Sequence, residues 1–181
     1  MARARNTGAR AAAGQWLVFL DADTRLPQSL LREMVDGTAA GRFQGGGAPV
    51  RFDTARLRPA PALVVALWNT VSRCSKLAAG SFLFCRKADW QAVGGFDESF
   101  YAGEELNFSA KLKKELSRQG RNFAILPTPV PTSARKLDWN SDWQLLRLIP
   151  LALRPAAWKD REACAFWYRR PVAKAPTGGT P

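Results

Sequence analysis

The sequence contains no histidine, and this absence removes two classes of chemistry. Without His among the 181 residues, Ser-His-Asp and Cys-His catalytic groups are excluded, and so is most transition-metal chemistry, which relies on imidazole ligands. The three cysteines, Cys74, Cys85 and Cys164, are widely spaced and form no Cys-x-x-Cys pair. They indicate reduced thiols in a cytoplasmic protein rather than a disulfide framework or a zinc site. Any metal ion is then expected to be a hard cation bound by oxygen atoms.

Long apolar runs are also missing. The longest, around residues 61–68 and 145–153, fall well short of the roughly 18 residues that a membrane-spanning helix needs. The N-terminus carries Arg and Ala without a continuous apolar stretch, which is not typical of a signal peptide. We therefore expect neither a membrane span nor a signal peptide.

Acidic residues are scarce compared with basic ones. The chain has 27 Lys and Arg against 15 Asp and Glu, a net charge of +12. Such a charge favours phosphate-bearing ligands, an anionic membrane surface or nucleic acid. No nucleic-acid-binding module is recognised, so nucleic acid is not expected as a partner. The few acids gather at residues 21–23 and 97–105, where chemistry is therefore expected.

Alternating strand and helix patterns predict one α/β domain. The unbroken apolar run at residues 16–20 predicts a strand covered on both faces, as in a parallel sheet. The Gly triplet at 45–47 lacks the Lys-Ser/Thr of a P-loop and predicts close backbone packing beside an acceptor pocket. Further strands are expected after this triplet and at 80–86 and 123–126, and helices at 3–14, 27–37, 60–78, 87–93 and 104–120.

Two aspartates follow the predicted strand 16–20 directly. In an open α/β sheet, ligands bind at the carboxyl ends of the strands. Asp21 and Asp23 are alternate residues, so in an extended segment both carboxylates point the same way and can bind one cation. The expected cation is Mg²⁺ or Mn²⁺. The alternative is that both are turn and helix-capping residues before Pro27. The spacing alone does not decide between these interpretations.

A second acidic candidate lies at the start of the predicted helix 104–120. Helical offsets from Glu105 reach four residues of the apolar face, namely Phe108, Ser109, Leu112 and Leu116. The carboxylate of Glu105 is therefore expected to point toward the body of the protein, with the helix dipole favouring its ionised form. A partly buried carboxylate at the edge of a site is a candidate general base. The alternative is a helix-start acid with a purely local role.

Three segments together resemble the family 2 glycosyltransferases. They are "ARNTGARAAAGQWLVFLDADTRLP", then "RKADWQAVGGFDESFYAGEELNFSAKLKK", then "PTSARK". The resemblance implies a GT-A fold, a Rossmann-like three-layer α/β/α sandwich, over residues 1–136. It also implies that the family's first strands are missing, so an unpaired sheet edge and half a nucleotide pocket are expected. We expect a basic, aromatic extension over 137–170 and a disordered tail over 171–181.

The resemblance also implies an activity. A single sugar would pass from a nucleotide-sugar to an acceptor, a glycan, lipid or small molecule, with inversion and with Mg²⁺ or Mn²⁺ bound by Asp21 and Asp23. The family's Gln-x-x-Arg-Trp motif of polymerising members is absent, which favours single transfer. The resemblance implies these further roles: Arg5 and Asn6 near the nucleotide, Glu105 as the base, Glu104 at the acceptor, and Gly80, Ser81 and Arg135 at the acceptor or a phosphate.

Two departures from the family pattern leave a second hypothesis open. The acidic motif is Glu104-Glu105 where the family usually has Glu-Asp, and the first strands are missing. The alternative is a catalytically inactive remnant whose 137–170 extension binds a membrane surface or a protein. Under either hypothesis we expect a cytoplasmic protein, with peripheral contact at the inner face of the membrane as an option.

Overall fold

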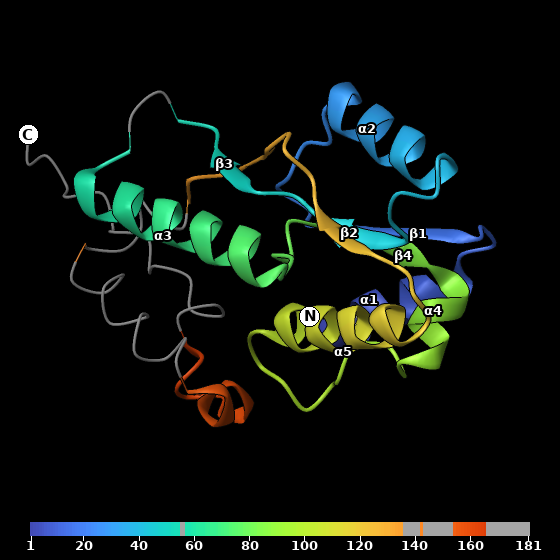
Figure 1. The fold of residues 1–181 in the computed structure, drawn as a ribbon. Coiled ribbons are helices and arrows are strands. Elements are labelled where there is room, and N and C mark those ends of the chain that lie inside the picture. The colour runs from blue at the N-terminus through green and yellow to red at the C-terminus, as the bar shows by residue number, and fades with distance from the viewer. Residues whose placement is uncertain (55–56, 136–141, 143–153, 166–181) are drawn as a thin grey trace, which may run out of the picture.

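The computed structural model describes residues 1–54, 57–135, 142 and 154–165 (Figure 1). A four-stranded sheet has the order β1-β4-β2-β5, and a second sheet pairs β3 with β6. The strands are β1 (Trp16–Leu20), β2 (Gly45–Gly47), β3 (Val50–Phe52), β4 (Phe82–Arg86), β5 (Phe123–Ile125) and β6 (Val130–Thr132). The helices are α1 (Ala2–Ala11), α2 (Gln28–Ala39), α3 (Pro59–Ser75), α4 (Lys87–Ala92), α5 (Glu104–Arg118) and the 3₁₀ helix η1 (Pro155–Lys159).

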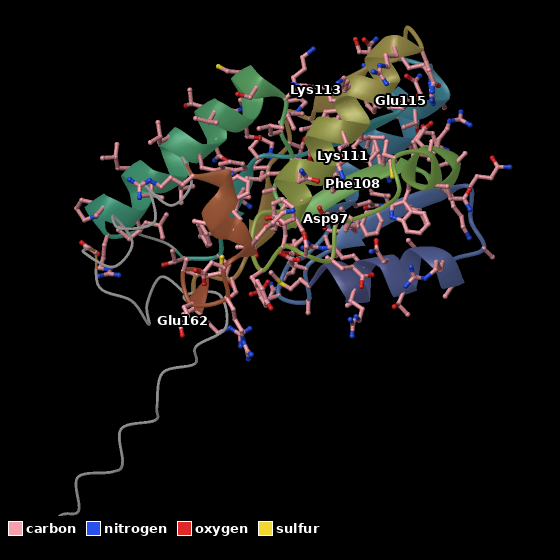
Figure 2. All side chains as sticks on the ribbon, turned by 90° about the horizontal axis from the view of Figure 1, so that it is seen from below. Asp97, Phe108, Lys111, Lys113, Glu115 and Glu162 are labelled. Carbon is pink, nitrogen blue, oxygen red and sulfur yellow. The ribbon has the colours of Figure 1, made fainter. Side chains whose placement is uncertain are left out.

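Helices cover both faces of the larger sheet. Helix α2 lies on one face, and α1, α4 and α5 lie on the other, which Figure 2 shows from below. The core has two parts accordingly: one contains Leu17, Phe108 and Leu112, the other Leu30 and Phe84. The predicted three-layer α/β/α arrangement is confirmed.

Strand β1 differs from its prediction. It pairs antiparallel with β4, from Trp16 opposite Arg86 to Leu20 opposite Phe82, and it has no second neighbour among the described residues. Val18 and Leu20 are each 40% exposed, so the expectation of two covered faces in a parallel sheet is wrong. As an edge strand among the described residues, β1 leaves the backbone N–H and C=O groups of one side without a strand partner. The predicted unpaired edge is confirmed.

The Gly triplet forms strand β2 itself rather than the approach to a strand. It lies inside the sheet, antiparallel to β4 and parallel to β5. A Cβ at Gly46 would overlap the carbonyl oxygen of Ala124, and one at Gly47 would overlap Ala78. The predicted close backbone packing is confirmed, and it explains why three glycines form a central strand despite their low strand propensity.

We expect Gly46→Ala to lower the free energy of unfolding by about 3 kcal/mol, because the added methyl group forces β2 away from β5. Chemical denaturation measures this loss. Gly8→Ala is the matched control: Gly8 lies in α1, where an added methyl group would meet nothing within 4 Å, and alanine is the better helix former. Equal stabilities for the two variants would contradict the packing argument.

The remaining predicted elements are found close to their expected bounds, except near the prolines at positions 127–131. Helix α2 continues past Gly37, against which the ring of Phe43 packs. The sequence pattern did not predict β6, because it contains Pro131. Proline is tolerated there since, among the described strands, β6 pairs with β3 alone.

The C-terminal predictions fall mainly outside the described part of the chain. Of the extension 137–170, the structure describes residues 142 and 154–165, and the tail 171–181 lies outside the described residues. In the described part of the chain, no helix is both long enough and apolar enough to cross a membrane.

Candidate functional site

The segment after β1 is a turn. The backbone N–H of Thr24 donates to the carbonyl of Asp21 at 3.0 Å, so the two aspartates lie in a turn and not in the extended segment that the sequence predicted. Oδ1 of Asp21 accepts a hydrogen bond from Arg5 at 2.8 Å, whereas Oδ1 of Asp23 accepts one from the Thr132 hydroxyl at 3.4 Å. The two aspartates therefore contact different groups, one toward α1 and α5 and the other toward β6.

Arg5 joins the turn to the start of α5. Besides Asp21, its guanidinium donates to Oε1 of Glu104 at 2.7 Å and lies 3.7 Å from Oε2 of Glu105. It also reaches the carbonyl oxygen of Gly80 at 3.5 Å, and a Cβ at Gly80 would lie 2.6 Å from its Nη2. Only 11% of the Arg5 side chain is exposed. Arg5 is thus an internal link between three carboxylates, and Gly80 leaves the space it occupies.

The side chain of Asn6 forms its hydrogen bonds with a loop of the protein itself. Its amide donates to the carbonyl of Phe96 at 2.8 Å and to Glu98 at 3.0 Å, and its Oδ1 accepts from the N–H of Phe96 at 2.9 Å. Asn6 is 5% exposed. These bonds argue against the donor contact predicted for Asn6 and assign it to holding the loop around Phe96 against α1.

Glu104 and Glu105 occupy different environments. Glu104 is completely buried, which argues against its predicted contact with an acceptor, and its Oε2 has no hydrogen-bond partner among the described residues. The Glu105 side chain is 20% exposed. Burial, followed by repulsion from Glu104, raises the pKa of Glu105 to about 7. These effects oppose the helix dipole, which favours the ionised form of Glu105.

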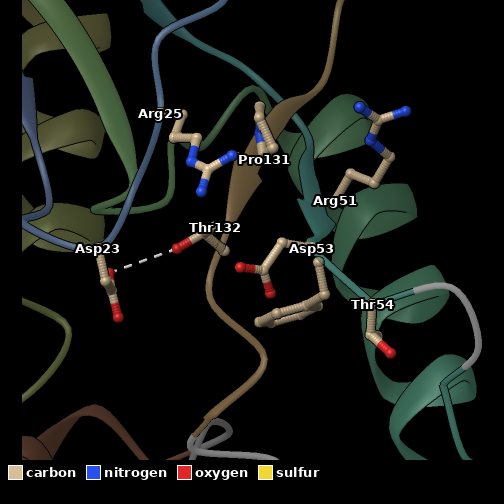
Figure 3. Close-up of a pocket in the computed structure, with 8 residues that line it drawn as sticks. Asp23, Arg25, Arg51, Asp53, Thr54, Pro131 and Thr132 are labelled. Carbon is tan, nitrogen blue, oxygen red and sulfur yellow. Dashed lines mark hydrogen bonds between the residues drawn. The ribbon is translucent and has the colours of Figure 1, made fainter.

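Two adjoining pockets of about 450 and 720 Å³ open beside Asp23. Both are lined by Asp23, Arg25, Asp53 and Thr54, and Figure 3 shows Asp23, Arg25 and Asp53 around Thr132. Two further arginines, Arg51 and Arg135, each line one of them. Gly80 and Ser81 line neither of these pockets. The pockets therefore combine carboxylates with three guanidinium groups, a set suited to phosphate oxygens.

Comparison with known proteins shows what the chain is similar to. The family model "Glycosyl transferase family 2" matches residues 1–70. Over these residues the chain is similar to that family. A search of the curated proteins finds no match. The resemblance in the sequence is confirmed for this region.

Solved structures show the fold of the chain as a whole. It is similar to the mannosyltransferase PcManGT from Pyrobaculum calidifontis in complex with GDP-Man and Mn²⁺, with a TM-score of 0.54 and 17% identity over 93% of this chain and 53% of that one. It is also similar to residues 1–349 of TarS from S. aureus, with a TM-score of 0.52 and 16% identity over 92% of this chain and 50% of that one. The fold is of the GT-A type, and the chain spans about half the length of these structures.

The oxygen ligands at the turn after β1 fit a hard divalent cation. Asp23 is exposed at the pockets, and 35% of the Asp21 side chain is exposed. The described residues contain no group of three or more His, Cys, Asp or Glu side chains that could enclose a metal ion. Mg²⁺ needs no such group, since it commonly takes one or two carboxylates and completes its shell with water and substrate phosphates.

Three pocket residues were missed in the sequence. Asp53 follows β3 directly and accepts a hydrogen bond from the N–H of Ala134 at 2.9 Å; a carboxylate directly after a strand was the available signal. Arg25 and Arg51 carry no comparable signal. They reach the pockets because β3 pairs with β6 and the Arg25 N–H donates to the carbonyl of Pro131 at 3.0 Å.

Proposed function

We propose that the protein transfers a single sugar from a nucleotide-sugar to an acceptor hydroxyl, with inversion at the anomeric carbon and with a divalent cation. The observation that carries this proposal is the arrangement around the turn after β1. Its exposed carboxylate, Asp23, lies in arginine-lined pockets, and its other carboxylate, Asp21, is linked through Arg5 to Glu105. The PcManGT complex with GDP-Man and Mn²⁺ supports the choice of donor class and cation.

The donor half of the site is the turn and the pockets. Asp21 and Asp23 are the residues that would hold Mg²⁺ or Mn²⁺, which when bound supplies neutralisation of the diphosphate charge. Arg25 and Arg135, both on the pocket wall, would hold phosphate oxygens by charge-assisted hydrogen bonds. The departing diphosphate would then lie beside Asp23.

The acceptor half is Glu105. In its ionised form Glu105 removes the proton from the acceptor hydroxyl, and the resulting oxygen attacks the anomeric carbon. The bond from that carbon to the diphosphate oxygen breaks on the opposite side, so the configuration inverts. The proton ends on the Glu105 carboxylate, whose pKa of about 7 suits a group that accepts a proton and later returns it to water.

The direct test is an assay of the protein with a panel of nucleotide-sugars, with Mn²⁺ or with EDTA. We expect release of nucleoside diphosphate in the presence of Mn²⁺ and its loss in EDTA. Hydrolysis of the donor by water serves as the readout while the acceptor is unidentified. No release from any donor of the panel would contradict the proposed activity.

A second candidate function is supported by one face of α3. Leu63, Leu67 and Val71 recur every four residues on this helix and are 65%, 51% and 40% exposed, and α3 contains no Asp or Glu. Figure 2 shows α3 set apart from the helices that cover the sheet. An apolar face on a chain of charge +12 suits an anionic membrane surface.

The membrane candidate predicts that the protein sediments with phosphatidylglycerol vesicles, and that Leu63→Ser/Leu67→Ser reduces the bound fraction severalfold. Asp21→Asn/Asp23→Asn is the control, which should leave vesicle binding unchanged. Sedimentation that is independent of Leu63 and Leu67 would contradict a role for α3.

A further inference from the structure

One guanidinium serves both halves of the site. Nη2 of Arg5 donates to Asp21 at 2.8 Å, and Nη1 donates to Glu104 at 2.7 Å and lies 3.7 Å from Glu105. Three carboxylates thus surround one positive charge. With 11% of its side chain exposed, Arg5 has little access to a ligand from solvent. These contacts argue against the direct nucleotide contact that the sequence predicted for Arg5.

A charge placed beside Asp21 changes how the Arg5 guanidinium is shared among its three carboxylate partners. An added cation beside Asp21 repels the guanidinium and competes with it for the same carboxylate. Arg5 retains two other partners, since Glu104 is fixed and buried and Glu105 lies just beyond hydrogen-bond distance. The low exposure of the cluster weakens solvent screening, so these effects are larger here than at the protein surface.

We propose that Arg5 is a positioning residue that competes with the divalent cation for Asp21 and so couples the cation site to Glu105. This inference rests on the proposed function. Loading of the donor site turns Arg5 from Asp21 toward α5, where its charge favours the ionised form of Glu105. Glu105 is then ionised when the donor is bound. In the free protein, Arg5 is shared between Asp21 and the two glutamates of α5. Glu104 is the buried anchor of this arrangement.

Manganese binding alone tests the competition without relying on catalysis. Titration of the protein with Mn²⁺, followed by electron paramagnetic resonance, gives the affinity. Glu104→Gln removes the competing partner of Arg5, so Arg5 pairs more fully with Asp21, and we expect Mn²⁺ affinity to fall about threefold or more. Arg5→Gln/Glu104→Gln removes the guanidinium without a change in net charge, and we expect affinity to rise about three- to tenfold above that of the wild type.

The opposite signs of these two changes are the distinctive result. Arg3→Gln is the matched control, because Arg3 lies on the same helix, 87% exposed and paired with Glu98, and its loss should leave Mn²⁺ affinity unchanged. Thermal unfolding verifies that each variant is folded, and the single variant Glu104→Gln keeps a testable prediction if the double variant unfolds.

The outcomes separate the inference from the proposed function. If the Mn²⁺ affinities of the wild type and both variants are equal, or if both variants change in the same direction, the coupling through Arg5 is overturned. The proposed function is not affected by that result. Absence of Mn²⁺ binding by the wild type would overturn the cation site of the proposed function and the coupling with it. Opposite changes with an unaffected Arg3 control support both.

Discussion

Glu105→Gln is expected to lower the rate of sugar transfer by roughly 10²- to 10⁴-fold, the usual contribution of a general base. Glutamine has nearly the same shape but cannot accept the proton of the acceptor hydroxyl. The measurement is kcat for transfer, with the donor affinity determined in parallel. Donor affinity should change little, because Asp23 and the arginines of the pockets stay in place.

Glu115→Gln is the control for this substitution, since Glu115 lies on the same helix and pairs with Arg118 away from the site. It should leave kcat unchanged. If Glu105→Gln instead weakened donor binding and left kcat at saturating donor unchanged, Glu105 would be part of the donor site and not the base.

The pKa of Glu105 gives this prediction a pH dependence. The kcat/KM for transfer should rise as Glu105 of the free protein ionises and level off above its pKa of about 7. Stability should change in the opposite direction. Because burial raises the pKa of Glu105 from 4.5 to about 7, the folded protein holds the proton more tightly than the unfolded chain. Stability therefore falls as pH rises between these two values. Glu105→Gln should remove that slope, which thermal unfolding across the interval measures.

Asp23→Asn is expected to lower Mn²⁺-dependent turnover by about 100-fold or more, because a bound cation contributes several kcal/mol to a developing diphosphate charge. The assay is release of nucleoside diphosphate at saturating donor. Asp36→Asn is the matched control: Asp36 is an exposed aspartate near the end of α2, so it undergoes the same change of charge and should retain full turnover. Unchanged turnover in Asp23→Asn would contradict the role of Asp23 in the donor site.

The elements that could be predicted from the sequence are those with local signals. Strand β1 is an apolar run, and α5 has Leu112 and Leu116 on its buried face with Gly120 after its end, in the left-handed conformation. Strand β2 has no side chains to show a pattern. It forms because the neighbouring strands approach so closely that only glycine fits, and that approach depends on residues far away in the chain.

The candidate site divides in the same way. The position of Asp21 and Asp23 after a strand, and of Glu105 on the inner side of a helix, could be predicted from spacing. The partners of Arg5 could not, because Asp21 and Glu104 are 16 and 99 residues away from it. Asp53 lines the same pocket as Asp23 because β3 pairs with β6. A short strand that contains proline, as β6 does, gives no clear signal in the sequence.

Calorimetric titration with GDP- and UDP-sugars in the presence and absence of Mn²⁺, for the wild type and Asp23→Asn, is the most direct measurement. The account predicts that Mn²⁺ strengthens sugar-nucleotide binding to the wild type and has no such effect on Asp23→Asn. Binding that is unaffected by Mn²⁺ in the wild type, or equally strengthened in Asp23→Asn, would contradict a cation site at the turn after β1.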